Sequence, residues 1–441
     1  PIGVDTDKQC LRIDDPSLKT SLSIEAPQRI NRIISRCRPE EQHPRSVVGH
    51  PDVPRGTTGE PSGPGVLAGK ALRGFDHVRT LGVASHAPWR PPMSTGTIST
   101  MQLGLSLGYW GAQPPTDLVD LVQAAEGLGY DAVWSAESWG SDAFSPLVWL
   151  AAHTERIRLG TGIVQMSART PTATAMHAVT LDHLSGGRLI LGLGVSGPQV
   201  VEGWYGQPSH RPLARTREYV EILRRAFRRD EHLSFEGEFH QHPYTGEGST
   251  GLGKPLKVMV HPLRSDIPIF IGAEGPKNVT QTAAIADGWL PLYYSPYRTE
   301  VYADQLAGAP PDFEVALNVA VTITTDDRPE TIAEALAPVK GMLGFYVGGM
   351  GAKGQNFHTK LMARMGFAVE ADSIQDLFLE GRREEATAAV PDQFADEISL
   401  VGTPARIQDR LAAFADSPVT MLNVAPRSPD HLARVAEILL G

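Results

Sequence analysis

From about residue 101 onward, short apolar runs alternate with longer stretches in which apolar residues recur every three or four positions. The first run spans 102–107, and the stretch after it has apolar residues at positions 118, 121, 122, 125 and 128. This interval places the side chains on one face of a helix, whereas a short apolar run bounded by turn residues is typical of a buried strand. The pattern predicts a strand and then an amphipathic helix, capped by Thr116 and ended by Gly129.

The same pattern of strand and helix repeats along the chain. Eight strands are predicted, at residues 102–107, 132–136, 157–163, 189–193, 267–272, 288–293, 313–323 and 419–424. Further helices are predicted near residues 144–153, 172–184, 213–229, 278–286 and 404–414. Strands that alternate with helices form a parallel sheet, and eight such units favour closure into a barrel. The predicted fold class is therefore α/β, a (β/α)8 TIM-type barrel, with a doubly wound open sheet as the alternative.

Two long interruptions break the repeat, one after the fourth strand and one after the seventh. Residues 232–266 are rich in glycine, proline and aromatic residues and lack helical periodicity. Residues 340–390 contain a group of glycines, namely Gly348, Gly349, Gly351 and Gly354. We interpret both segments as insertions that shape the substrate pocket.

The first hundred residues differ from the rest of the chain. They hold 12 of the 35 prolines and show little sustained periodicity. We therefore predict two parts: residues 1–100 as a disordered or non-native N-terminal extension, and residues 101–441 as the barrel domain.

Charge and composition exclude several classes of function. Lys and Arg number 13 against 10 Asp and Glu in residues 1–100, which leaves 27 against 40 in residues 101–441. An acidic body argues against a nucleic-acid partner. No apolar run reaches the roughly 18 residues that a membrane span needs, and no export leader is evident, so we expect a cytoplasmic protein.

Cysteine usage limits the chemistry that the body can perform. Both cysteines, Cys10 and Cys37, lie in the first hundred residues, so residues 101–441 have no thiol for nucleophilic catalysis or for metal ligation. Histidines such as His177 and His183 lie on apolar helical segments and are expected to serve structure, so we assign no metal. Redox chemistry in this body would need an organic cofactor.

In a barrel of this kind the site is built from the turns that follow the strands. After the second strand comes the run 135–139, which places the carboxylate of Glu137 and the indole of Trp139 at the barrel mouth. Glu137 can act there as a general acid or base if it is buried. The alternative is a solvated glutamate that caps the next helix.

Small residues mark the next three turns. Gly160 and Gly162 lie in the third strand, where glycine indicates a bulge or the close approach of a ligand. The turn after the fourth strand includes Ser196, Gly197 and Pro198, whose surroundings can offer backbone amides to an anion. The turn after the fifth strand, made of Gly272, Ala273, Glu274 and Gly275, opens a helix whose N-terminus suits a phosphate.

Four stretches carry a resemblance to a known family. They are TLDHLSGGR at 180–188, LGLGVSGPQVVEGWYG at 191–206, PLARTREYVEILR at 212–224 and AEGPKNV at 273–279. With them, residues 101–441 resemble the luciferase-like monooxygenase superfamily, and within it the F420-dependent oxidoreductases of the methylenetetrahydromethanopterin-reductase-like branch. In the first stretch, Asp182, Ser185, Gly187 and Arg188 are expected to tie a helix end to the following strand, away from the site.

The resemblance implies that coenzyme F420 lies across the barrel mouth. Its ring would lie against a non-proline cis peptide at Gly162-Ile163, and its phosphate would meet the turns at Ser196-Gly197 and Glu274-Gly275. Basic residues could line an exit path for its anionic tail; they are Arg169, Arg211, Arg215 and Lys277. The activity implied is hydride transfer between the deazaflavin and a small organic substrate.

Two positions depart from the pattern of the family. Related dehydrogenases carry an Asp-His pair where this chain has Glu137-Ser138, so the acid is retained and the imidazole is lost. Sugar-phosphate dehydrogenases of the family have a catalytic Glu where this chain has Pro198, which argues against such a substrate. Candidates for the substrate side are Tyr109, Trp110, Trp139 and His261.

Alternatives to this interpretation remain. FMN is the alternative cofactor, with monooxygenation as the reaction, because the same fold serves both cofactors. A non-catalytic relative that only binds a cofactor is a third possibility. We expect a homo-oligomer, a homodimer in the simplest case.

Overall fold

The computed structural model describes residues 2–5, 10–13, 101–425 and 428–441. The chain divides into two units, residues 1–83 and 84–441. In the first unit, β1 (Ile2–Asp5) pairs antiparallel with β2 (Cys10–Ile13). The rest of the predicted N-terminal extension lies outside the described residues.

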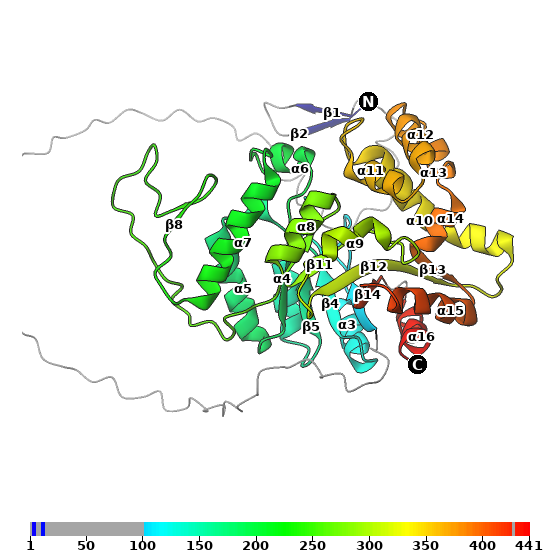
Figure 1. Ribbon diagram of the computed structural model, residues 1–441, viewed down its shortest axis with the longest axis horizontal. Helices are drawn as coiled ribbons and strands as arrows, with labels where there is room; N and C mark the ends of the chain where they lie inside the picture. Colours follow the sequence, from blue (N-terminus) through cyan, green and yellow to red (C-terminus); the bar gives the residue numbers. More distant parts are fainter. Residues whose placement is uncertain (1, 6–9, 14–100, 426–427) are drawn as a thin grey trace, which may run out of the picture. The chain divides into compact units, whose positions relative to one another are not determined.

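The second unit is built on a closed barrel of eight parallel strands (Figure 1). In order around the barrel they are β3 (Gln102–Ser106), β4 (Ala132–Ser135), β5 (Arg158–Thr161), β7 (Leu189–Gly194), β10 (Ile269–Gly272), β11 (Gly288–Leu290), β12 (Glu314–Ile323) and β14 (Met421–Val424). Closure comes from β14 and β3, where Met421 lies opposite Gln102 and Val424 opposite Leu105. The predicted (β/α)8 barrel is confirmed, and the open doubly wound sheet is excluded.

Helices follow most of the strands. Those close to the predicted positions are α3 (Leu118–Gly127), α4 (Phe144–Ala151), α5 (Pro171–Ser185), α7 (Pro212–Arg228), α8 (Pro276–Ile285) and α15 (Pro404–Ala415). Two further helices, α9 (Glu300–Leu306) and α16 (Pro429–Leu440), were not predicted. The predicted cap of α3 is displaced by one residue, because Asp117 rather than Thr116 is its N-cap. A short helix that the sequence did not predict, α6 (Pro198–Gly203), follows β7.

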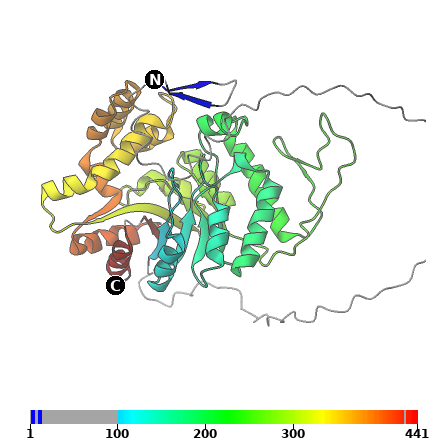
Figure 2. The same cartoon turned by 180° about the vertical axis from the view of Figure 1, so that it is seen from behind.

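The segment predicted as the second insertion is helical rather than irregular. It comprises α10 (Pro329–Gly349), α11 (Phe357–Arg364), α12 (Ala368–Leu379), α13 (Arg383–Ala388) and α14 (Asp392–Glu397), which lie together at one side of the barrel (Figure 2). The predicted boundary at residue 340 falls inside α10. The glycines of this region suggested a loop. In the structure Gly348 instead allows α10 to pack closely on α12, because a Cβ at this position would lie 2.5 Å from Cβ of Phe378.

A further parallel strand outside the eight of the barrel, β13 (Ser399–Gly402), follows these helices and was not predicted. It pairs with the second half of β12, where Ala320 lies opposite Ser399 and Ile323 opposite Gly402. Four residues are too few to show a period, so the sequence pattern did not reveal this strand.

The first predicted insertion is confirmed as a long excursion between α7 and β10. Its only regular structure in the described residues is the hairpin of β8 (Phe235–Glu236) and β9 (Gln241–His242). Both oxygens of the Glu218 carboxylate in α7 accept backbone amides of this hairpin, at 2.8–3.0 Å. Beyond the hairpin, the excursion reaches out past α7 in both views (Figures 1 and 2).

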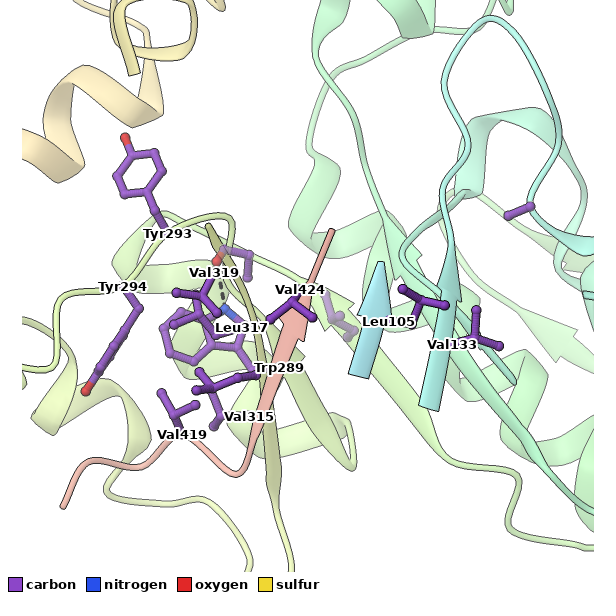
Figure 3. Packing of buried hydrophobic residues seen from close by; sticks show 14 of the residues in the cluster. Leu105, Val133, Trp289, Tyr293, Tyr294, Val315, Leu317, Val319, Val419 and Val424 are labelled. Atoms are coloured by element: carbon purple, nitrogen blue, oxygen red, sulfur yellow. Dashed lines mark hydrogen bonds between the residues drawn. The ribbon is translucent and has the colours of Figure 1, made fainter. Parts of the chain in front are cut away.

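The core has an inner and an outer layer. Inside the barrel lie Ala132, Trp134, Ile190, Phe270, Ala316 and Met421. Between strands and helices, Val315, Leu317 and Val319 of β12 pack near Trp289 (Figure 3), because alternate residues of a strand face opposite sides. Gly160 leaves room for the inner layer, since a Cβ there would lie 2.3 Å from Trp134.

The amino ends of the strands are tied together by the residues expected to serve structure. The guanidinium of Arg188 donates to the carbonyl oxygens of Ala151, Thr154 and Ile157 at 3.0–3.1 Å. Asp182 is fully buried and forms an ion pair with Arg264. The structural interpretation of this stretch is confirmed.

Candidate active site

The turn after β4 buries Glu137, whose residue exposure is 5%. Arg169 binds both of its carboxylate oxygens, Nη2 to Oε1 at 2.7 Å and Nη1 to Oε2 at 2.9 Å. The amide of Gln165 donates a further hydrogen bond to Oε2 at 2.8 Å. Glu137 is therefore neither a solvated loop residue nor a helix cap, but the centre of a buried polar cluster.

This cluster links the turns after β4 and β5. The amide of Glu137 donates to the carbonyl of Ile163 at 3.2 Å, and Nε2 of Gln165 donates to the carbonyl of Glu137 at 3.3 Å. Burial lowers the pKa of Arg169, but its hydrogen bond to Glu137 and the charge of that carboxylate outweigh burial and raise the pKa. Every hydrogen bond to the Glu137 carboxylate comes from a donor, so both of its oxygens serve as acceptors.

The peptide bond between Gly162 and Ile163 is cis, as the resemblance implied. It joins β5 to the short strand β6 (Val164–Gln165), which pairs with the end of β7. Ile163 lies against two other strand ends, since a Cβ at Gly194 would be 2.7 Å from its side chain and one at Gly272 would be 3.4 Å away. The structure thus brings the ends of β5, β7 and β10 together around Ile163.

The turn after β7 presents Ser196 and Gly197 ahead of Pro198. Ser196 has a φ of 58°, in the left-handed region, and Gly197 is the N-cap of α6. Ser196 and Pro198 are exposed. The hydroxyl of Tyr205, which follows α6, donates to the carbonyl of Ser138 at 3.1 Å and so ties this turn to the turn after β4.

The turn after β10 holds Ala273, Glu274 and Gly275 before α8. Gly275 is the N-cap of α8 and has no side chain to cap the helix amides. The Glu274 carboxyl is buried, and its Oε1 accepts the amide of Leu292 at 2.6 Å. Burial raises the pKa of Glu274 to about 8, against the smaller opposing effects of the Leu292 amide and the charge of Arg364. The sequence indicated Glu274 only as part of a phosphate turn.

Exposed aromatic residues mark these turns. Tyr109 after β3 is 62% exposed and Trp139 after β4 is 57% exposed, whereas Trp110 is half-buried against the core. Two further exposed aromatic residues were missed by sequence reasoning: Trp204, after α6, and Phe357, beside Gly275. Apolar surface of this kind around a barrel mouth is typical of a ligand site.

His261, the fourth candidate for the substrate side, does not lie in the turns that follow the strands. Nε2 of His183, near the end of α5, donates to the carbonyl of His261 at 2.7 Å. Arg264, three residues further on, donates to the carbonyl of Leu189, the first residue of β7, at 2.7 Å. The structure therefore places His261 toward the amino ends of the strands and does not bring it together with the other substrate-side candidates.

The basic residues expected along an exit path have differing environments. Arg169 is engaged by Glu137, and Arg211 forms an exposed ion pair with Glu238. The guanidinium of Arg215 lies over the ring of Phe239, 4.9 Å from its centroid. Lys277 is exposed in the first turn of α8.

Comparisons with known proteins indicate the family of the chain. A model of the family described as luciferase-like monooxygenase matches residues 87–421. A protein of Mycobacterium tuberculosis named "Putative coenzyme F420-dependent oxidoreductase Rv3520c" is 50% identical over 348 residues, which cover 77% of this chain and 99% of that protein. The 5,10-methylenetetrahydromethanopterin reductase of Archaeoglobus fulgidus is 28% identical over 70% of this chain and 89% of its own length.

A solved structure shows the same fold. The coenzyme F420-dependent tetrahydromethanopterin reductase of Methanopyrus kandleri superimposes with a TM-score of 0.61 at 23% identity, over 77% of this chain and 99% of that one. None of the described helices is both long and apolar enough to cross a membrane.

Proposed function

Because the chain belongs to the luciferase-like monooxygenase family, we propose that it is an oxidoreductase that uses coenzyme F420 to transfer a hydride to or from a small organic substrate. The 50% identity to a relative named as F420-dependent, over 99% of that relative, carries this proposal. FMN with monooxygenation is the second candidate, favoured by the description of the family model.

The residues at the mouth fit a flat ring that bears a phosphate chain. The cis peptide at Gly162-Ile163 lies at the end of β5, and Gly272 at the end of β10 lies against Ile163 without a side chain of its own. We assign these residues to the ring of the cofactor, together with Ser138 at the neighbouring turn. When bound, the deazaflavin supplies a carbon that gives or accepts a hydride, while the protein supplies orientation and a dry site.

The phosphate side of the cofactor is assigned to two turns. Ser196, Gly197 and Pro198 follow β7, and the backbone of Ala273, Glu274 and Gly275 follows β10. The turn after β10 opens α8, whose N-cap is glycine, so the positive end of that helix can face an anion. Tyr109, Trp110 and Trp139 are assigned to the substrate side.

We assign Glu137 to positioning at this site. Its carboxylate holds Arg169 and the Gln165 amide, and its backbone holds Ile163, so it fixes the segment that carries the cis peptide.

A second copy of the chain is the proposed partner. The neighbouring helices α4 and α5 expose large apolar side chains, namely Val148, Trp149, Met176 and Leu184, at 39–61% of their surface. Exposed apolar surface on adjacent helices favours a protein interface. Light scattering of the purified chain should give twice the monomer mass, and a monomeric Trp149→Glu/Met176→Glu variant that keeps its helical circular dichroism would place the interface here.

The test of the function is a pair of titrations on the full chain. F420 and FMN are each added while tryptophan fluorescence is followed, and F420 oxidation or reduction is then assayed against a panel of alcohols, ketones and enones. We expect saturable quenching by F420 and turnover with at least one member of the panel. Tight binding of FMN without any response to F420 would overturn the proposal in favour of the second candidate.

A further inference from the structure

The excursion between α7 and β10, which reaches out past α7 in Figure 1, returns to the barrel through residues 256–263, which we call the return segment. Its backbone is held by polar contacts with the ends of two helices. Nε of Arg229, the C-cap of α7, donates to the carbonyl of Val258 at 2.7 Å. Nε2 of His183, near the end of α5, donates to the carbonyl of His261 at 2.7 Å. The return segment therefore runs along the ends of α7 and α5.

The apolar side chains of the return segment face outward. Four of them expose more than half of their surface, namely Leu256, Met259, Val260 and Leu263. Met259 exposes the most, at 91%. The ammonium group of Lys257 instead turns back to its own chain, where Nζ donates to the carbonyl of Asp230 at 2.7 Å. The segment thus binds its charged group internally and presents its apolar groups, an arrangement that marks an interaction surface.

Two neighbouring helices of the barrel, α4 and α5, have an outer surface without charged side chains. α4 contains no Asp, Glu, Lys or Arg, and the one such residue of α5, Asp182, is buried in its ion pair with Arg264. The exposed residues of the two helices are Ser145, Val148, Trp149, Met176, His177, Thr180, His183 and Leu184. α7, which also packs on α5, differs: it carries an ion pair between Arg225 and Glu221, as a water-facing helix usually does.

The return segment and these two helices form one continuous surface, which we call the apolar face. Its large apolar residues are Val148, Trp149, Met176, Leu184, Leu256, Met259, Val260 and Leu263. α4 and α5 pack side by side, with the ring of His177 stacked on that of Phe144 at 5.1 Å between centroids. A Cβ at Gly187, three residues beyond Leu184, would lie 3.6 Å from the side chain of Leu263. The end of α5 therefore adjoins the return segment.

The size of the apolar face and its lack of charge favour a second copy of the chain as its occupant. With on the order of 100 Å² exposed for each large apolar residue, the face approaches the roughly 800 Å² that each partner contributes to an interface of standard size. Two identical faces can meet across a twofold axis without cost only where no like charges are brought together, and the apolar face meets this condition. An anionic membrane surface attracts clusters of basic residues, whereas Lys257 is the one Lys or Arg in the three elements.

We propose that the apolar face is the contact surface of a homodimer, in which the return segment of each copy packs on the apolar face of the other. This inference rests on the second copy proposed above as the partner, extends its contact surface from α4 and α5 to the insertion, and is independent of the cofactor. It assigns the return segment to the subunit interface rather than to the substrate pocket. The position of His261, toward the amino ends of the strands and away from the mouth, supports this assignment.

The first test changes the return segment alone. Met259→Glu/Val260→Glu places two carboxylates in the proposed interface, where burial of a charge without a counter-ion is strongly unfavourable. We expect the dimer dissociation constant of the full chain, measured by analytical ultracentrifugation, to rise about 10²-fold or more, with an unchanged circular dichroism spectrum. The control, Val369→Glu, adds a carboxylate at an exposed apolar position of α12 and should leave the dissociation constant unchanged.

The second test asks whether the return segment is covered in the dimer. Hydrogen exchange of peptides from residues 256–263 should be slower in the wild-type dimer than in Trp149→Glu/Met176→Glu, although neither substitution lies in the return segment. Peptides from the hairpin of β8 and β9 should exchange equally in both proteins, because Glu218 of the same chain holds that hairpin.

The outcomes separate this inference from the other proposals. If the wild type is a dimer, and Met259→Glu/Val260→Glu dimerises as tightly as Val369→Glu, the return segment is not in the interface and the inference fails, while the interface at α4 and α5 stands. A wild type that is monomeric overturns both, and pelleting of that monomer with phosphatidylglycerol vesicles would identify a lipid surface as the occupant. Because neither test uses F420 or FMN, failure of the cofactor proposal leaves this inference to be decided by the dimer alone.

Discussion

Arg169 holds Glu137 by both ends of its guanidinium, at 2.7 and 2.9 Å, across 32 residues of sequence. The side chains are 17% and 4% exposed, so the pair is largely shielded from water. A two-bond fork fixes the direction of the carboxylate as well as its position. The turn after β4 and the segment that carries the cis peptide are therefore held as one unit.

Breaking this pair should destabilise the fold and the unit it holds. Glu137→Gln leaves Arg169 buried without its counter-ion and should lower the free energy of unfolding by about 3 kcal/mol, as for other broken buried pairs. Urea unfolding measures the change. Because the cost comes from the uncompensated charge, the double variant Glu137→Gln/Arg169→Gln should lose less than the sum of the single variants. Additive losses would show that the two side chains act independently.

The barrel interior yields a second prediction. A Cβ at Gly160 would lie 2.3 Å from Trp134, so Gly160→Ala must displace the indole or the strand, and we expect a loss of about 1–3 kcal/mol. Gly127→Ala is the control, because a Cβ there meets no described atom within 4 Å and Gly127 is the last residue of α3. Urea unfolding of both variants should separate them, and equal stability would contradict the close packing on Trp134.

Most of the fold could be read from the sequence because its signals are local. An apolar run between turn residues marks a strand wherever the strand lies, and all eight barrel strands were found in this way. The helices α10–α14 were missed, and in α10 the glycines imitate a loop. At Gly348 the helix α10 packs closely against Phe378, which is 30 residues away in the sequence. No local sequence pattern contains that contact.

The packing of α10 on α12 can be tested within one helix. Gly348→Ala places a Cβ 2.5 Å from Phe378 and should cost about 1–3 kcal/mol. Gly341→Ala in the same helix meets no described atom within 4 Å and should stabilise by about 0.5–1 kcal/mol, because alanine loses less backbone entropy than glycine. Thermal unfolding followed by circular dichroism gives both values. A destabilised Gly341→Ala would show that α10 is not helical there.

The site was less predictable than the fold. The resemblance located the cis peptide and the small-residue turns, because these are properties of short stretches. The surroundings of each carboxyl group are made by distant neighbours: Arg169 for Glu137, and Tyr293 after β11 with Tyr346 of α10 for Glu274. Sequence reasoning therefore named both residues but not the distant partners that surround them.

The ion pair between Arg298 and Glu397 of α14 predicts how the stability of the fold changes at acid pH. Burial raises the pKa of Glu397, but hydrogen bonds from Arg298, Gln393 and Ser295 outweigh it and hold the pKa below the usual value. A carboxyl whose pKa is lower in the folded state stabilises the protein above its unfolded pKa, near 4.3, and this stability is lost as the pH falls through the folded value. Urea unfolding between pH 6 and 3 should show a steeper loss for the wild type than for Glu397→Gln. If the stability of both proteins fell equally steeply with pH, the lowered pKa of Glu397 would be contradicted.

Glu274 should give the opposite dependence on pH. Its pKa is raised to about 8, so the folded protein binds this proton more tightly than the unfolded chain does. The contribution to stability is complete below the unfolded value, near 4.3, and is lost progressively as the pH rises to about 8. Wild-type stability should therefore fall relative to Glu274→Gln across this window and level off above it, in urea unfolding of the cofactor-free chain. A difference between the two proteins that stays constant from pH 5 to 9 would mean that the pKa of Glu274 is not raised in the folded protein.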